Sequence, residues 1–164
     1  MSNYPTLPKD QRQKVLAGVT FVFDFDGTLV PQTKFNNEVQ NIVEYIGMKM
    51  AVNPNAFGVK WTIATSRPYV DGALIDEVLR KNNAHPIYPV MTQKTAIPTT
   101  GNDAEINFKL QCLEYCKKTY GGEVIYVDNN QELCDKLVEK NKDLTTISLI
   151  DFLIMMQWRL EEVQ

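Results

Sequence analysis

Two acidic residues close an apolar run near the start of the sequence, in Phe21-Val-Phe-Asp24-Phe-Asp26-Gly27-Thr28. On an extended chain, side chains two positions apart point the same way, so the carboxylates of Asp24 and Asp26 are expected on one side, before Gly27 lets the chain turn. Two carboxylates at the end of a buried strand are costly unless a cation or a reaction needs them. The pattern predicts a cation-binding or catalytic site, and an Asx-type turn that closes the strand is the structural alternative.

This segment resembles the first motif of the haloacid dehalogenase (HAD) superfamily, an apolar run followed by Asp-x-Asp-Gly-Thr or Asp-x-Asp-Gly-Val, and every position of the motif fits. The resemblance implies a Mg²⁺-dependent phosphatase in which Asp24 is the nucleophile and forms an aspartyl-phosphate. It makes Asp26 the general acid and base. An aspartate at position 26 favours phosphoryl transfer over dehalogenation, because dehalogenase members lack that acid.

The second and third family motifs also have counterparts, and they supply phosphate-binding residues. Thr65 ends the apolar segment Trp-Thr-Ile-Ala-Thr65-Ser-Arg-Pro and is implied to bind the phosphoryl group, with Ser66 as its alternate. Arg67 either grips a second phosphate oxygen or pairs with a helix carboxylate at the surface. Lys109 fits the motif lysine that neutralises the phosphoryl charge, and Lys94 is its competitor. A solvated surface position remains the alternative for either lysine.

The fourth family motif, a strand that ends in acids, completes the implied magnesium site. Val-Ile-Tyr-Val-Asp128-Asn-Asn-Gln-Glu ends in this way. The resemblance implies that Mg²⁺ is held by Asp24, Asp128 and the backbone carbonyl of Asp26. Many members carry a second acid one or about four positions later. Here those positions are Asn129 and Glu132, which are further candidates for the metal site.

Strand and helix signals alternate along the chain, and the strand segments are mostly apolar. This alternation predicts an α/β protein with a three-layer Rossmann-like fold, in which helices cover both faces of a parallel sheet of about five strands. Ligands bind such sheets at the carboxyl ends of the strands. The predicted strands are Val19–Phe25, Lys60–Thr65, Pro86–Met91, Glu123–Val127 and Thr145–Ile150. The predicted helices are Glu38–Met50, Tyr69–Asn82, Ala104–Thr119, which stops at Tyr120-Gly121-Gly122, Gln131–Asn141, and Asp151–Glu162, capped by Asp151.

The length of 164 residues fits one domain, 1–164, whose first eighteen residues form a polar lead-in. HAD proteins often cover the site with a cap inserted after the first motif or between the second and third. The stretches between Thr28 and Trp61 and between Arg67 and Lys109 are too short for a folded cap, so a capless or minimally capped site is expected. An open site suits a large substrate, and short stretches around Arg67, Lys109 and Asp128 also resemble the phosphatase domains of polynucleotide end-repair proteins.

Net charge, cysteine count and apolar runs indicate which partners and which cellular compartment to expect. The net charge of −3 and the pI near 5.2 give no global attraction to nucleic acid or to anionic membranes. Three cysteines provide no disulfide framework and fit a reducing compartment. Neither a signal peptide nor an apolar run approaching the roughly 20 residues of a membrane span is recognised. A cytoplasmic protein without a membrane partner is expected.

Three functions remain open on this basis. The first is a polynucleotide 3′-phosphatase, which the open site and Arg67 favour. The second is a phosphatase of small molecules such as nucleotides or sugar phosphates. The third is a non-catalytic binding module on a HAD-like fold, against which the intact Asp24, Asp26, Lys109 and Asp128 argue.

Overall fold

Five parallel strands form one sheet in the computed structural model, which describes residues 18–30, 60–93, 103–152, 154 and 155. The strand order is β3-β2-β1-β4-β5, so the chain runs outward from β1 first in one direction and then in the other. The strands are β1 (Val19–Phe23), β2 (Lys60–Pro68), β3 (Met91–Gln93), β4 (Glu123–Val127) and β5 (Thr145–Ile147). Ligands bind open parallel sheets where the strand order reverses, which here is between the carboxyl ends of β1 and β4.

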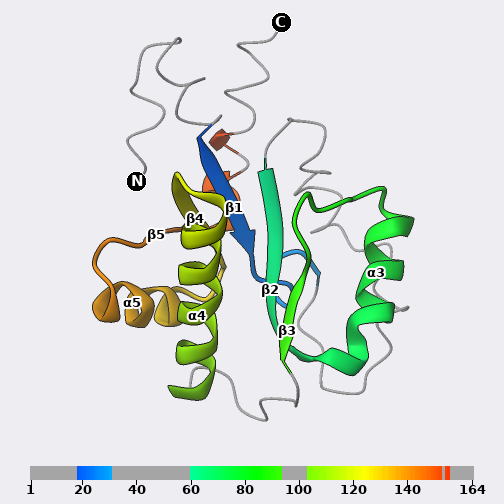
Figure 1. The fold of residues 1–164 in the computed structure, drawn as a ribbon, viewed down its shortest axis with the longest axis horizontal. Coiled ribbons are helices and arrows are strands. Elements are labelled where there is room, and N and C mark those ends of the chain that lie inside the picture. Colours follow the sequence, from blue (N-terminus) through cyan, green and yellow to red (C-terminus); the bar gives the residue numbers. More distant parts are fainter. Residues whose placement is uncertain (1–17, 31–59, 94–102, 153, 156–164) are drawn as a thin grey trace, which may run out of the picture.

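Helices cover both faces of the sheet (Figure 1). They are α3 (Gly72–Lys81), α4 (Asp103–Tyr120) and α5 (Gln131–Lys140), and residues 149–152 and 154–155 are also helical. One apolar cluster joins the sheet to α3 and to Phe152 and Met155, and a second joins the opposite face to α4 and α5. The three-layer α/β fold expected from the sequence is therefore confirmed.

The central strand β1 is buried along its whole length because it has helices on both sides. Phe21 and Phe23 face the first cluster, where their rings meet Phe152 edge-on at centroid distances of 5.1 and 4.8 Å. Val22, one position away, faces the second cluster. The alternation fixes the register of β1, because a shift by one residue would exchange its two faces.

Several predicted boundaries are wrong by a few residues. The first strand ends at Phe23 rather than Phe25, and β2 continues past Thr65 to Pro68, where Pro68 is the register partner of Gln93. The helix predicted to begin at Tyr69 opens with a 3-10 turn, η4 (Tyr69–Asp71). The largest error is the third strand, predicted at Pro86–Met91 and found at Met91–Gln93.

The reason for the error in the third strand lies in its prolines. Pro86 and Pro89 have no backbone N–H to give to a sheet ladder. The chain before β3 is attached to β2 by the backbone N–H groups of Ile87 and Tyr88, which both donate to the Trp61 carbonyl at 3.1 and 3.4 Å. The Thr62 hydroxyl also contacts the carbonyl oxygens of Tyr88 and Pro89, at 3.0 and 2.8 Å. Extended apolar sequence therefore lies beside β2 but does not pair with it as a strand until Met91.

The start of the last helix was also misplaced. Strand β5 ends at Ile147, not Ile150, and the helix is capped by Ser148 rather than by Asp151. The Ser148 hydroxyl oxygen accepts a hydrogen bond from the Asp151 backbone N–H at 3.2 Å, as an N-cap side chain does for the third helical residue. Asp151 thus lies in the first turn, where a negative charge is favourable.

Parts of some predictions lie outside the described residues. These are most of the polar lead-in, the helix Glu38–Met50, most of the loop Thr92–Asp103, and the end of the last helix. The capless interpretation depends on the first and third of these gaps and stays a prediction. Within the described residues, every helix is too short or too polar to cross a membrane.

The turn between α4 and β4 gives a first prediction. Gly121 and Gly122 both have left-handed backbones, with φ of 71° and 69°. A Cβ at Gly121 would meet nothing, whereas a Cβ at Gly122 would press against the Gly18 carbonyl oxygen, which accepts the Glu123 N–H at the start of the β1–β4 pairing. Gly121→Ala should cost about 1 kcal/mol of unfolding free energy through its backbone alone. Gly122→Ala should cost about 2 kcal/mol more.

Urea unfolding of both variants measures the difference. Equal destabilisation of the two would contradict the close approach of Gly122 to Gly18.

Candidate active site

A tight turn at the end of β1 carries the two aspartates. Gly27, with φ of 80°, reverses the chain, and the Phe25 carbonyl accepts the backbone N–H groups of Leu29 and Val30 at 3.0 and 3.1 Å. The reversal brings Thr28 back beside Asp24, and its hydroxyl donates to Asp24 Oδ2 at 3.3 Å. The turn predicted at Gly27 is confirmed, and it places a neutral donor against one oxygen of Asp24.

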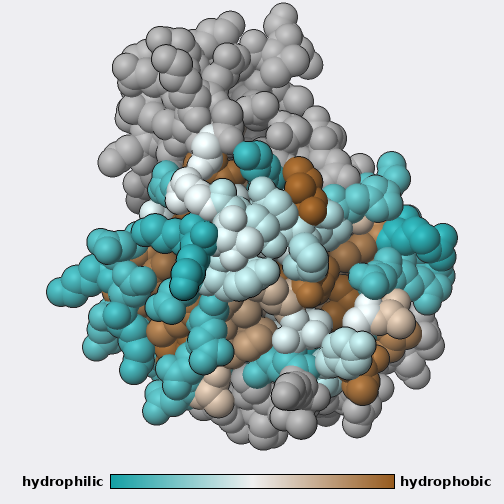
Figure 2. Space-filling model, viewed as in Figure 1, coloured by the Kyte–Doolittle hydropathy of each residue, from teal (hydrophilic) through white to brown (hydrophobic). Residues whose placement is uncertain are grey.

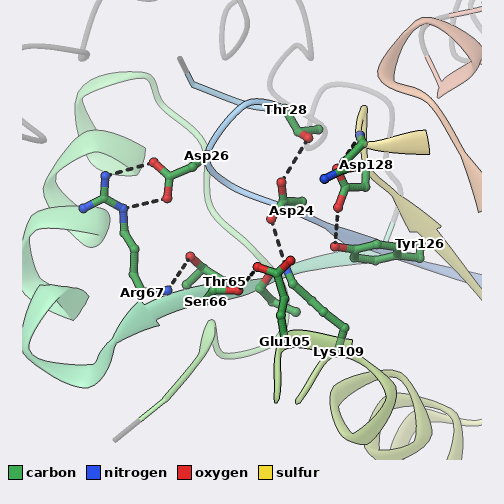
Figure 3. Close-up of polar contacts among 12 residues, drawn as sticks. Asp24, Asp26, Thr28, Thr65, Ser66, Arg67, Glu105, Lys109, Tyr126 and Asp128 are labelled. Carbon is green, nitrogen blue, oxygen red and sulfur yellow. Dashed lines mark hydrogen bonds and ion pairs between the residues drawn. The ribbon is translucent and has the colours of Figure 1, made fainter. Parts of the chain in front are cut away.

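The other oxygen of Asp24 contacts a fully buried lysine (Figure 3). Lys109 extends from α4, and its Nζ lies 2.8 Å from Asp24 Oδ1 while also donating to the Ala64 carbonyl at 2.5 Å. Burying an ammonium is costly unless it is paired, and this one is paired to a residue that keeps 17% of its side chain exposed. Lys109 therefore holds a positive charge at the carboxyl end of β1. Its competitor Lys94 lies outside the described residues.

Burial and nearby charges set the protonation of this pair. Burial raises the pKa of Asp24 to about 7; Lys109 opposes the shift, and the charges of Asp128 and Asp26 add to it. Burial by itself would lower the pKa of Lys109, but Asp24 and Asp128 outweigh it, and the net shift is upward. Lys109 therefore stays positively charged at neutral pH, and the pKa of Asp24 lies above that of an ordinary aspartate.

Asp128, at the end of β4, has both carboxylate oxygens fixed. The Tyr126 hydroxyl donates to Oδ2 at 2.7 Å, and the Asn130 backbone N–H donates to Oδ1 at 2.8 Å. Its burial raises its pKa, against the charge of Lys109 and these hydrogen bonds. Tyr126 was not predicted as a site residue, although it lies on β4 two positions before Asp128, a spacing that puts two side chains of an extended chain on the same side.

Asn129 and Glu132 are placed differently. The Asn129 amide links three segments: its Nδ2 donates to the Gly27 carbonyl at 3.3 Å, and its Oδ1 accepts the Leu149 N–H at 3.0 Å. The Glu132 side chain is 79% exposed and pairs with Lys136 on the outside of α5 at 3.2 Å. Asn129 thus connects the end of β4 to the turn after β1 and to the last helix through hydrogen bonds. Glu132 forms its ion pair with Lys136 and not with a residue of the candidate site.

Arg67 binds the second aspartate of the motif. Its Nε and Nη2 contact the two oxygens of Asp26 at 2.8 and 2.9 Å, and its Nη1 contacts Asp71 at 3.2 Å. Such a bidentate pair fixes both position and orientation. Asp24 and Asp26 both lie at the end of β1, but Figure 3 shows the carboxylate of Asp26 directed toward Arg67 and that of Asp24 toward Lys109.

The end of β2 is connected to α4 by a pair that the sequence did not predict. Thr65 is buried, and its hydroxyl oxygen accepts the Arg67 N–H at 3.1 Å. The Ser66 hydroxyl donates to Glu105 at 2.8 Å, and Glu105 is only 5% exposed. Glu105 lies four residues before Lys109, hence on the same face of α4. That spacing was the available signal for an acid that shares the environment of Lys109.

The donor set is compatible with Mg²⁺. Asp24 and Asp128 are close enough for the charge of Asp128 to raise the pKa of Asp24, and a cation between them would offset that repulsion. In the described part of the chain, no three His, Cys, Asp or Glu side chains are grouped to hold a metal ion. Mg²⁺ commonly binds through one or two carboxylates and keeps several waters, so two carboxylates are a sufficient protein contribution.

Comparison with known proteins adds a likeness of fold. No protein-family model matches the sequence, and no curated protein matches it significantly. A chain in the solved structure of the Pnkp1/Rnl/Hen1 complex is similar, with a TM-score of 0.55 and 14% sequence identity. The match covers 80% of this chain and 46% of that one, so this chain spans less than half the length of its structural neighbour.

Proposed function

We propose that this chain is a Mg²⁺-dependent phosphatase of the HAD superfamily that hydrolyses phosphate monoesters through an aspartyl-phosphate at Asp24. The observation that carries the proposal is the contact of Asp24 with the fully buried Lys109, 2.8 Å away, at the carboxyl end of the central strand. A nucleophile for an anionic substrate needs a nearby positive charge, and a lysine with no exposure supplies one at low dielectric.

Asp24 and Asp128 are the side chains that would hold the magnesium ion, with the Asp26 carbonyl as the family resemblance implies. When bound, the ion supplies charge screening between Asp24 and the substrate and orients the phosphoryl group. Loss of phosphate release in EDTA, with recovery in excess Mg²⁺, is the corresponding expectation.

The chain's own residues then act in two steps. One Asp24 oxygen forms a bond to phosphorus as the bond to the leaving oxygen breaks, and Asp26 gives a proton to that oxygen. A water then attacks the phosphorus, its proton passes to Asp26, and the bond to Asp24 breaks. Lys109, with Thr65 and Ser66 at the end of β2, would surround the phosphoryl oxygens. Arg67 acts first of all on Asp26, whose carboxylate it orients.

Replacement of Asp26 by asparagine tests its role as an acid. Asp26→Asn should lower kcat by about 10²- to 10⁴-fold for a substrate with a poor, alkyl leaving group, which must be protonated to depart. The loss should be much smaller for p-nitrophenyl phosphate, whose leaving group needs no proton. Steady-state rates on both substrates give the comparison, and an equal loss on both would contradict the assignment.

The phosphorylated end of a polynucleotide, with a 3′-phosphate, is the substrate that we favour. The resemblance of short stretches to polynucleotide end-repair phosphatases supports it, and the likeness to the Pnkp1/Rnl/Hen1 complex is compatible with it. Phosphate release should therefore be measured on 3′-phosphorylated oligonucleotides, mononucleotides, sugar phosphates and phosphopeptides, with wild type and Asp24→Asn side by side.

The outcomes of this screen separate the candidate functions. Release from oligonucleotides that Asp24→Asn abolishes supports the proposal. Release from mononucleotides or sugar phosphates alone selects a small-molecule phosphatase. Absence of release from every class, with Mg²⁺ present, would leave only a binding module.

A further inference from the structure

An apolar, aromatic groove runs along α4 beside the edge strand β3. It encloses about 500 Å³ and is open to solvent. One wall is a stripe of α4 that includes Phe108, Tyr115 and Tyr120, and the other is the chain from Pro89 to Thr92. On the face seen in Figure 2, strongly hydrophilic residues gather at the two sides, and weakly polar and apolar residues lie between them, in the region between α4 and α3.

Several residues that line the groove are neighbours in the sequence of candidate active-site residues. Tyr69, which lines the groove, comes two residues after Arg67 and is 75% exposed. Phe108 directly precedes Lys109, and Thr92 precedes Gln93, whose amide donates to the Ser66 carbonyl at 3.0 Å. Three separate segments thus each contain a residue that lines the groove and, within two positions of it, a phosphate-binding candidate or a residue in contact with one. From Phe108 to Tyr120 the helix rises about 18 Å, which is longer than one nucleotide.

The chemistry of the lining suits flat, weakly polar groups. None of the described residues that line the groove carries a charge, so ion pairs would contribute nothing inside it. Four aromatic rings line it, and Tyr120 is already stacked on Tyr88 at a centroid distance of 3.5 Å, with the Tyr115 ring edge-on to it. Gln111 and Thr92 add hydrogen-bonding groups for a polar edge.

We infer that this groove binds the bases of a single-stranded polynucleotide whose terminal phosphate lies at Asp24. The inference rests on the proposed function and names the part of the substrate that the enzyme recognises. Every nucleobase has a face that stacks on aromatic side chains and a polar edge, and such stacking tolerates any sequence. The backbone phosphates would stay outside the uncharged groove.

An extended peptide fits the same surface less well. A peptide would add to β3, which is an edge strand of the sheet in the described residues, but that strand has only three residues, and its pairing with β2 is irregular between Ala64 and Pro68. Main-chain pairing supplies the affinity in strand addition, and three residues offer little of it.

Binding of matched oligonucleotides tests the inference. Wild-type protein in EDTA, where no turnover is expected, is titrated into fluorescent 3′-phosphorylated strands that differ only in having bases or abasic sugars next to the phosphate. Both strands carry the same charge. The base-bearing strand should bind about tenfold tighter or more. Because the groove is uncharged, this ratio should change little between low and high salt, although both affinities fall.

Single-residue variants test whether the preference for base-bearing strands arises in the groove. Tyr69→Ala and Tyr115→Ala remove exposed rings and should each reduce the preference for bases about fivefold or more. Val70→Ala is the matched control, since Val70 is 76% exposed and adjacent to Tyr69 but does not line the groove. Its preference should equal that of wild type.

Failure of this inference can be told apart from failure of the proposed function. Equal binding of both strands would overturn the groove assignment, and so would tyrosine variants that behave like Val70→Ala. If the protein still releases phosphate from p-nitrophenyl phosphate, the proposed phosphatase function stands despite either result. Tighter binding of a phosphopeptide than of the base-bearing strand would overturn it too. Absence of phosphate release from all substrates would instead remove the proposed function.

Discussion

Replacement of Asp24 by asparagine is expected to lower kcat for phosphate release by about 10⁴-fold or more, because it removes the atom that forms the covalent bond. The change is close to isosteric, and the asparagine carbonyl can still accept the Lys109 ammonium. Because the change also takes a carboxylate away from the buried Lys109 ammonium, a loss of unfolding free energy should accompany it. Turnover is therefore compared under conditions in which urea unfolding shows both proteins to be folded.

Asp76→Asn provides the control for this experiment. Asp76 is exposed on α3, so its variant should match wild type in rate. Urea unfolding of both variants shows that each is folded. Turnover by Asp24→Asn within tenfold of wild type on any substrate would exclude Asp24 as the nucleophile.

Replacement of Lys109 by methionine should have the second-largest effect, on both rate and stability. Loss of a positive charge beside the transferring phosphoryl group should lower kcat by about 10³-fold. Removal of one member of a buried ion pair should also cost about 3 kcal/mol of unfolding free energy, since it leaves Asp24 without its cation. Methionine fills much of the same volume, so the cost comes mainly from the charge.

The pH dependence of the residual rate supplies a second readout for Lys109→Met. Lys109 lowers the pKa of Asp24 from the higher value that burial would impose. Without it, the pKa of Asp24 rises further, and the nucleophile is ionised only at higher pH. The acid limb of the rate profile should therefore move to higher pH.

Lys81→Met is the matched control for the lysine substitution. Lys81 pairs with Glu77 at 3.2 Å on the outside of α3, and both side chains are 43% exposed. An exposed pair of this kind is worth well under about 1 kcal/mol, so rate and stability should stay near those of wild type. Equal stability losses for the two variants would mean that the Lys109–Asp24 pair is not the buried contact described above.

The fold and the main acidic pair could be predicted because their signals are local and periodic. Buried parallel strands are continuous apolar runs, and an acid at the end of such a run marks the carboxyl edge of the sheet, as Asp24 and Asp128 do. The choice of Lys109 over Lys94 came from family spacing, and the structure places Lys109 on Asp24. Predicted boundaries were wrong where local contacts other than regular strand pairing fix the chain, at Thr62 before β3 and at Ser148 before the last helix.

Contacts between distant segments were harder to foresee. Nothing in the local sequence shows that Arg67 holds Asp26, forty-one residues away, and the alternatives considered for it were phosphate or a helix carboxylate. The predicted pairing of Arg67 with a helix carboxylate at the surface is correct in part. Asp71, which directly precedes α3, also accepts a hydrogen bond from Arg67, but Arg67 itself is buried. Glu105 joins Ser66 across thirty-nine residues, which only the packing of α4 on β2 brings together.

Chemical trapping tests the central claim, covalent catalysis at Asp24, most directly. Wild type is mixed with a phosphate monoester and Mg²⁺, quenched within one turnover, and reduced with borohydride, which converts an aspartyl-phosphate into homoserine. Peptide mass spectrometry then locates the modified residue. The account predicts homoserine at position 24 in wild type and none in Asp24→Asn. Modification at another residue, or phosphate release by wild type with position 24 never modified, would contradict it.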